Sequence, residues 1–259
     1  MLRALYTSAT GMKAQELMID NTANNLANVN TNGFKRSIVN FADLLYDTQR
    51  QAGASASDGQ VLPTGIQIGS GVRAVGTTKV FSSGVFEPTG NPLDVGIEGD
   101  GFFQVTLPSG QTRYTRDGAF HTDPNGALVT GDGLPIVGGV TIPQNAVYSS
   151  ITIGTDGTVS GLTAGSDQPT DFGRLELVRF PNSAGLSSEG GNLYAETQAS
   201  GTPSTDGVGF LRQKHLERSN VEVVTELISL ITAQRAYEVN SRAVRAGDEM
   251  LSVTTDIVR

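Results

Sequence analysis

Residues 216–258 read LERSNVEVVTELISLITAQRAYEVNSRAVRAGDEMLSVTTDIV, a segment without proline and with a single glycine. An apolar residue recurs at every seventh position, and the row is Leu216, Val223, Leu230, Tyr237, Val244, Leu251 and Val258. The other end of the chain carries a second such row, formed by Leu5, Met12, Ile19 and Leu26. An apolar repeat of this period lets helices wrap around one another along a narrow buried seam. We therefore predict helices over about 2–28 and 219–257, paired as a coiled coil whose seam serves self-assembly.

A single amphipathic helix lying on its own domain would show a similar period. A strict spacing of seven drifts off a straight helix face by about 20° per heptad, which favours a supercoiled partner. At the start of the second helix, Ser219 or Asn220 is expected to act as the N-cap, since either side chain accepts hydrogen bonds from the first turn. A cluster of asparagines over residues 21–32 ends the first helix, and a buried amide in such a cluster would fix the register of the pair.

The middle of the chain has a different character. All ten prolines lie between Pro63 and Pro203, and only three of the 32 glycines lie in the first 40 or the last 49 residues. Short apolar runs alternate there with turns, and three hairpins are predicted: 101–107 with 111–115, 119–122 with 127–130, and 151–153 with 158–160. The predicted fold class is α+β, with paired terminal helices and a β-rich barrel or sandwich inserted between them. The predicted domains are a helix over 1–33, an extended or loop connection over 34–72, a β-rich outer domain over 73–215 and a helix over 216–259.

Composition favours a subunit over a free-standing enzyme. Only 37% of the residues are hydrophobic and there is no Trp, which is little for one compact core in 259 residues. The net charge is −8, and 17 of the 26 acidic residues lie in the middle, over 41–210, which disfavours nucleic acid as a partner. There is no Cys, so disulfides and thiolate metal sites are excluded. Neither a signal peptide nor a membrane span is visible, so we expect a cytosolic protein or one exported without leader cleavage.

Motifs for chemistry are weak. His121 and His215 are the only histidines, and their spacing fits no zinc motif, so both are expected to be structural or surface residues. The glycines of 96–101 precede a strand, which favours a turn over a phosphate loop. The acids of 94–100 do not fit the calcium-loop spacing. A carboxylate pair for glycoside hydrolysis stays open, but nothing in the sequence singles out two residues. We predict no catalytic residue, no cofactor, no metal and no small-molecule substrate.

Several longer motifs resemble one family, the flagellar rod and hook proteins of bacteria. The most specific is the stretch Asn24, Asn25, Leu26, Ala27, Asn28, Val29, Asn30, Thr31, Asn32, Gly33, Phe34 and Lys35. The β region matches through 83–84, 91–95, 99–103 and 114–118, and the last helix matches through 219–221 and 233–241. The resemblance covers essentially the whole chain. The length and the 40–72 segment are most similar to those of the distal-rod members.

The resemblance implies a structural subunit that stacks helically into a tube, with the terminal helices inside and the β domain outside. It implies export through the flagellar type III apparatus without a cleaved signal peptide. The implied location is the distal rod of the basal body, from periplasm to outer membrane. The implied partners are further copies of the chain, the proximal rod proteins, the hook protein and the ring proteins of the peptidoglycan and outer membrane. A hook or proximal-rod subunit of the same family is the main alternative, and a secreted β-domain hydrolase with coiled-coil tails is another.

Overall fold

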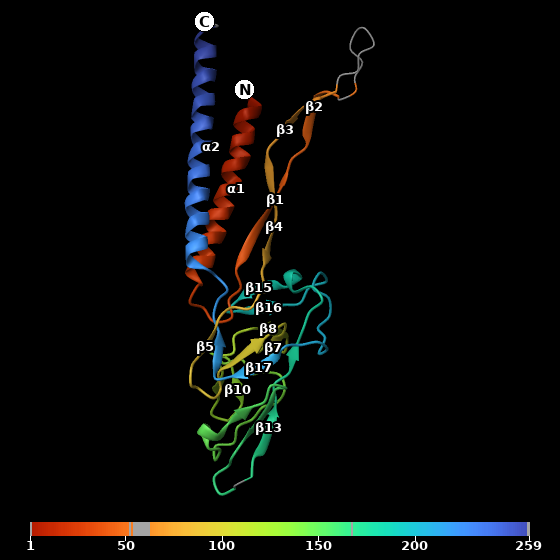
Figure 1. Ribbon diagram of the computed structural model, residues 1–259, viewed down its shortest axis with the longest axis vertical. Coiled ribbons are helices and arrows are strands. Elements are labelled where there is room, and N and C mark those ends of the chain that lie inside the picture. The colour runs from red at the N-terminus through yellow and green to blue at the C-terminus, as the bar shows by residue number, and fades with distance from the viewer. Residues whose placement is uncertain (1, 52, 54–62, 167, 258–259) are drawn as a thin grey trace. The chain divides into compact units, whose positions relative to one another are not determined.

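The computed structural model describes residues 2–51, 53, 63–166 and 168–257 of the chain. The fold is α+β, because an N-terminal and a C-terminal helix flank a β-rich region as predicted (Figure 1). The chain divides into two compact units. Unit 1 consists of residues 1–26, 37–78 and 223–259, and unit 2 consists of residues 27–36 and 79–222.

Unit 1 contains both helices, α1 (Leu2–Ala27) and α2 (Val223–Ile257). The two lie side by side and run in opposite directions, so that α1 begins at the end of the pair where α2 finishes (Figure 1). Leu5 lies against Gly247, and Gly11 lies against Asn240. A glycine inside α2 therefore does not break the helix, which continues ten residues past Gly247 to its end at Ile257.

The rest of unit 1 is a two-stranded ribbon. Strand β1 (Ser37–Asp43) pairs with β4 (Val72–Lys79), and further along β2 (Tyr46–Arg50) pairs with β3 (Ile66–Gly69). The segment predicted as a connection over 34–72 thus supplies most of this ribbon, while residues 52 and 54–62 lie outside the described part. The ribbon follows α1: the N–H of Val72 donates to the hydroxyl of Thr10 at 3.4 Å, and Arg3 donates to the carbonyl of Ile68 at 2.6 Å.

The start of α2 differs from the sequence prediction. The helix begins at Val223, so the expected N-cap at Ser219 or Asn220 is wrong. Asn220 has other partners, since it accepts the N–H of Arg36 at 2.8 Å and donates to the carbonyl of Val80 at 2.8 Å. These bonds hold the chain in a non-helical conformation before the helix. Leu216, the first residue of the predicted helical row, lies instead in strand β18.

Unit 2 is built from antiparallel strands. Its largest sheet has the order β14-β7-β8-β16-β15, a second sheet has the order β11-β12-β13, and β6 pairs with β17, β5 with β18 and β9 with β10. The bounds are β5 Phe86–Pro88, β6 Val95–Glu98, β7 Phe102–Thr106, β8 Thr112–Thr115, β9 His121–Thr122, β10 Leu128–Val129, β11 Thr152–Ile153, β12 Thr158–Gly161, β13 Thr170–Arg174, β14 Leu177–Val178, β15 Ser187–Gly190, β16 Leu193–Ala195, β17 Phe210–Gln213 and β18 His215–Glu217. Two short 3-10 helices, η1 (Tyr148–Ser150) and η2 (Ser183–Gly185), lie in the loops.

The three predicted hairpins are confirmed as the antiparallel pairs β7–β8, β9–β10 and β11–β12. The turn between β9 and β10 shows why the sequence is informative here. Gly126 has φ of +83°, which glycine adopts without strain, and its N–H donates to the carbonyl of Asp123 at 2.8 Å.

Unit 2 has two hydrophobic clusters, one on each side of β7. Phe103 faces the larger cluster with Val95, Ile97 and Phe120, and Phe102 faces an aromatic cluster with Tyr114, Val178, Phe180 and Tyr194. Successive side chains of a strand point to opposite faces, which explains how adjacent phenylalanines serve both clusters. Unit 2 therefore has a core of its own.

Candidate assembly surfaces

The contact between α1 and α2 is made by small residues. Ala14 and Thr22 on α1 and Ala233 and Gly247 on α2 are all buried. A Cβ atom added to Gly11 would lie 2.9 Å from the amide nitrogen of Asn240, and one added to Gly247 would lie 2.5 Å from the Leu5 side chain. These separations are shorter than real Cβ contacts, so a side chain at either position would force the side chain of Asn240 or Leu5 to move.

The predicted apolar rows lie beside this contact. All four residues of the row that begins at Leu5 are half-buried, as are Leu230, Val244 and Leu251 of the other row. Val223 and Tyr237 are exposed, and Val258 lies outside the described residues. Leu216 lies in strand β18 of unit 2 and is not part of α2.

The sequence reasoning missed the other half of this contact. Glu226, Ala233, Asn240 and Gly247 also recur every seventh residue along α2, and all but half-buried Asn240 are buried. A search for large apolar residues passes over this row because it holds a carboxylate, an amide and two small residues. Its period of seven is the signal that would have found it.

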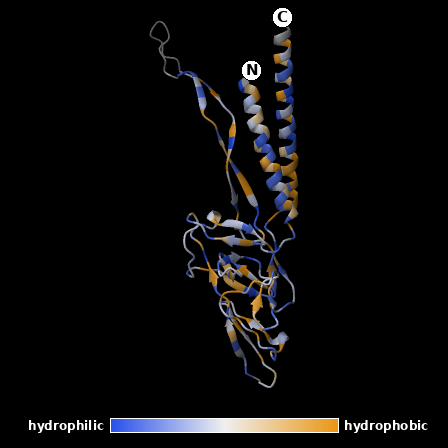
Figure 2. Ribbon diagram, turned by 180° about the vertical axis from the view of Figure 1, so that it is seen from behind, coloured by the Kyte–Doolittle hydropathy of each residue, from blue (hydrophilic) through white to orange (hydrophobic). Residues whose placement is uncertain are grey.

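Large apolar side chains of unit 1 stay exposed. Ala14 and Ala233 are its only buried hydrophobic residues among those described. Its exposed large hydrophobic residues include Leu17, Ile38, Phe41, Leu45, Tyr46, Ile66, Ile68, Val75, Val223, Val224, Leu227, Ile228, Ile231, Tyr237, Val239, Met250 and Val253. In Figure 2, hydrophobic residues recur along both helices and the ribbon. We define the α2 face as Val224, Leu227, Ile228 and Ile231, which are 64%, 41%, 61% and 49% exposed. Because monomeric proteins rarely leave such stretches uncovered, this unit needs a partner.

The motif at 24–34 supplies buried polar contacts to both units. Asn24 to Ala27 end α1, and the N–H of Thr31 donates to the carbonyl of Asn28 in the turn that follows. Asn25 is buried in unit 1, where it bonds Ser37 and Glu226. In unit 2, Gly33 has φ of +67° and Phe34 is buried, with the ammonium of Lys79 4.7 Å from its ring centre.

Lys35 belongs to a buried ion cluster in unit 2. Its ammonium lies 2.6 Å from one oxygen of Glu217, and the Nε atom of Arg116 lies 3.2 Å from the other. All three side chains are at most 1% exposed. Glu217 also accepts the N–H of Gly84 at 2.8 Å, and Lys35 also donates to the carbonyl of Ser82 at 2.7 Å. Burial and the neighbouring Arg116 lower the pKa of Lys35 to about 8, although Glu217 acts to raise it.

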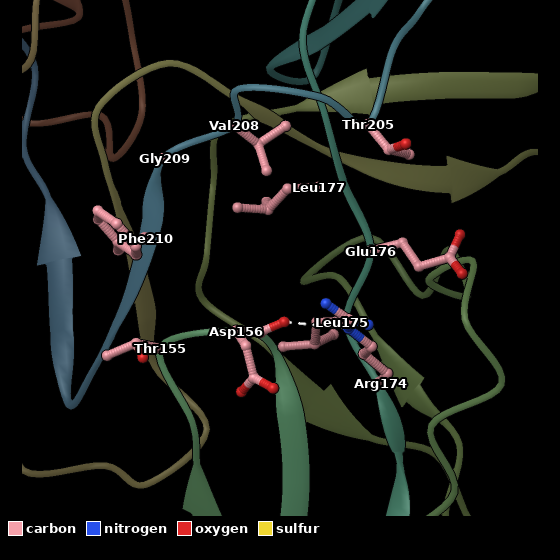
Figure 3. Close-up of a pocket in the computed structure, with 10 residues that line it drawn as sticks. All are labelled: Thr155, Asp156, Arg174, Leu175, Glu176, Leu177, Thr205, Val208, Gly209 and Phe210. Atoms are coloured by element: carbon pink, nitrogen blue, oxygen red, sulfur yellow. Dashed lines mark hydrogen bonds between the residues drawn. The ribbon is translucent and has the colours of Figure 1, made fainter.

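Unit 2 also carries open pockets without an evident reactive centre. The one in Figure 3 has a volume of about 480 Å³ and is lined by Asp156, Arg174, Glu176 and Phe210 among others. The carboxylates of Asp156 and Glu176 point apart, and Arg174 donates to the backbone carbonyl of Asp156 at 3.1 Å (Figure 3). Hydrogen bonds from Thr158 lower the pKa of Asp156, which explains this acid as a turn residue.

The two histidines are separate from these features. His121 is exposed in β9, and the Nδ1 atom of His215 lies 2.8 Å from the carbonyl of Gln213. Within the described ranges, His, Asp and Glu side chains form no group of three or more that could hold a metal. Over the same residues, neither helix is apolar enough over a sufficient length to cross a membrane.

Comparisons with known proteins agree along the whole chain. Family models match residues 5–35 (Flagella basal body rod protein), 96–161 (Flagellar hook protein FlgE/F/G D1 domain) and 212–257 (Flagellar basal body rod FlgEFG protein C-terminal). The flagellar basal-body rod protein FlgG of Buchnera aphidicola subsp. Schizaphis graminum is 49% identical over 256 residues, which cover 97% of this chain and 98% of that protein. FlgG of Borreliella burgdorferi is 43% identical over 264 residues that cover 100% of both chains. The flagellar hook-basal body complex protein FlhP of Bacillus subtilis is 30% identical over 272 residues, 99% of this chain and 100% of that one.

Proposed function

This chain belongs to the flagellar basal-body rod protein family, and from that premise we propose that it polymerises helically into the distal rod. The family is structural, so the chain is a structural protein and not an enzyme. One observation carries the proposal. Unit 1 buries only two alanines as hydrophobic residues among those described, whereas unit 2 has two hydrophobic clusters. A unit without a core of its own is completed by the same unit in neighbouring copies.

The α2 face is the main contact in this proposal. Burying a Val, Leu or Ile side chain fully contributes about 1.5–3 kcal/mol. Since the four residues of the face are roughly half exposed, covering them contributes on the order of 4 kcal/mol per subunit. That is comparable to the entropic cost of association, so each contact is weak alone and the polymer is stabilised by repetition.

The two predicted apolar rows also contribute to this contact between subunits. Leu5, Met12, Ile19 and Leu26 pack on the row from Leu230 to Val258, within and between subunits, as a coiled coil. The helices then form the inner layer of a tube around a channel, and the β-rich unit forms a barrel-like or sandwich-like outer wall. Repeated seams resist twisting, which lets the tube transmit torque to the hook.

We further propose partners and a location for the assembled chain. The rod continues the proximal rod proteins, carries the hook protein and turns inside the ring proteins of the peptidoglycan and outer membrane. The subunit reaches the periplasm through the type III export apparatus without cleavage of a signal peptide. The net charge of residues 41–210 is negative, with seven basic against 17 acidic residues, which keeps the outer wall soluble.

Electron microscopy of basal bodies from a strain that lacks this chain tests the proposal. We expect truncated rods without a hook. Complete rods that lack only the hook would instead assign the chain to the hook, and loss of the whole rod would assign it to the proximal segment. Normal flagella would contradict the proposal altogether.

A further inference from the structure

The side-chain amide of Asn25 joins three elements of unit 1. The residue lies near the end of α1 and is 1% exposed. Its Nδ2 donates to the carbonyl of Ser37 at 2.9 Å, and its Oδ1 accepts the N–H of Ser37 at 2.9 Å. The same Nδ2 donates to the carboxylate of Glu226 on α2 at 3.3 Å. One buried side chain therefore bonds both to the first residue of β1 and to the second helix.

An asparagine satisfies all of these partners at once. A backbone N–H only donates and a backbone carbonyl only accepts, so the two bonds to Ser37 fix which end of the amide is which. Aspartate would lose the donor and place a second carboxylate beside Glu226. Leucine would fill the space with neither group.

Glu226 makes the observed register of the helix pair more favourable than a register shifted by one heptad. It is 2% exposed and occupies the buried row in which Ala233 and Gly247 stand at the equivalent positions. In the observed register Asn25 meets Glu226, and Gly11 meets Asn240. Slipping α2 by one heptad would place Glu226 either opposite Met18 or beyond the end of α1. In the first case the carboxylate would be buried beside an apolar side chain without the amide of Asn25, which is unfavourable. In the second case the buried amide of Asn25 would lose the carboxylate that it contacts.

The glycine contacts of the observed register, Gly11 with Asn240 and Gly247 with Leu5, involve the ends of flexible side chains that can move, so they select the register less strictly than the buried pair of Asn25 and Glu226 does. We propose that Asn25 sets the position of α1 relative to α2, through Glu226, and relative to the start of β1, through Ser37. Asn25 is thus a positioning residue for assembly. A slip of one heptad displaces the α2 face by about 10 Å along α1. The face would then no longer be positioned to contact neighbouring subunits. That consequence for assembly rests on the proposed function, whereas the register within one chain does not.

The test measures the register directly in the full-length chain. The protein has no Cys, so cysteines placed at exposed Glu16 and Glu249 carry the only spin labels. Electron–electron resonance then gives the distance between the labels. We expect one narrow distance in the parent chain. For Asn25→Leu we expect retained helix content by circular dichroism but at least two populations, separated along the helix axis by about 10 Å.

Three further variants separate register from packing. Asn25→Asp should also broaden the distribution. Adding Glu226→Gln should restore one distance, since the new amide donates to the new carboxylate and Asn21 still donates to the carbonyl of Ser37 at 2.7 Å. Ala23→Leu, at an exposed position of the same helix turn, should leave the distance unchanged. A single unchanged distance in Asn25→Leu would overturn the proposal, and so would a broad distribution in the parent chain.

A cellular readout keeps this proposal distinct from the proposed function. Cells that produce Asn25→Leu should export the chain but fail to complete flagella, and the Asn25→Asp, Glu226→Gln pair should swim. If the distances behave as expected but the Asn25→Leu cells swim normally, the register assignment stands and its role in assembly is wrong.

Discussion

Replacing Glu217 with Gln tests the buried ion cluster of unit 2. The substitution keeps the shape of the side chain and an oxygen that accepts the N–H of Gly84, but it removes the only negative charge between Lys35 and Arg116. Two buried cations are then left without their counterion. Because all three side chains are at most 1% exposed, water does not screen the change.

The expected loss of stability follows from the burial of the cluster, and its pH dependence follows from the pKa of Lys35. Removing one partner of a buried ion pair costs about 3–5 kcal/mol, and we expect about 3 kcal/mol at pH 7 because the amide keeps part of the hydrogen bonding. Glu217 is the group that raises the pKa of Lys35, so without it that pKa falls below its present value of about 8. Lys35 then releases its proton in the folded variant at a lower pH than in the parent. Between pH 7 and 8 the variant therefore regains up to about 1 kcal/mol relative to the parent, in which Lys35 also begins to lose its proton over this range.

Urea unfolding of the full chain, followed by the near-ultraviolet signal of buried Tyr114 and Tyr194, measures these differences. Glu189→Gln is the control, since Glu189 pairs with Arg113 at the surface and its loss should cost less than about 1 kcal/mol. The reasoning would be refuted if Glu217→Gln cost no more than the control, or if its penalty were the same at pH 7 and pH 8.5.

Three other outcomes are expected. Ile228→Asp on the α2 face should change the stability of the single chain by less than about 0.5 kcal/mol yet abolish assembly, as seen by sedimentation and by hook counts in cells; wild-type hook numbers would contradict it. Gly247→Leu should separate the helices, because Leu5 already fills the space, and should lower the helix content of the chain by circular dichroism; unchanged helix content would count against the close contact. The free energy of unfolding should rise from pH 8 to 10, because unfolded Lys35, with a pKa of 10.5, binds a proton that the folded residue has lost. It should fall above pH 10, because burial raises the pKa of Tyr194 to about 12 in the folded chain. Urea unfolding at several pH values measures both slopes, and slopes of the opposite sign would contradict the prediction.

The sequence predicted the elements whose cause is local. The row from Val223 to Leu251 is helical because its period matches the helix, and α2 covers it. The turn at 123–126 forms a hairpin because Gly126 accepts a positive φ. The motif at 24–34 indicated the family because it is long and specific, and the basal-body rod family model matches residues 5–35, which include it.

What the sequence did not predict depends on partners that are distant along the chain. Lys35 and Glu217 are 182 residues apart, and no local pattern joins them. Asn220 does not cap α2 because Arg36 and Val80 already use its amide. The small and polar row of α2 was overlooked because its residues are selected for close approach and for a buried hydrogen bond, and not for hydrophobicity.

The most direct test of the central claim is a helical reconstruction of the assembled rod by electron cryomicroscopy. It would show what covers the α2 face, Val224, Leu227, Ile228 and Ile231, in the polymer. We predict that helices of a neighbouring copy pack on it. A rod whose subunits contact one another only through unit 2, with the α2 face open to solvent, would contradict the account.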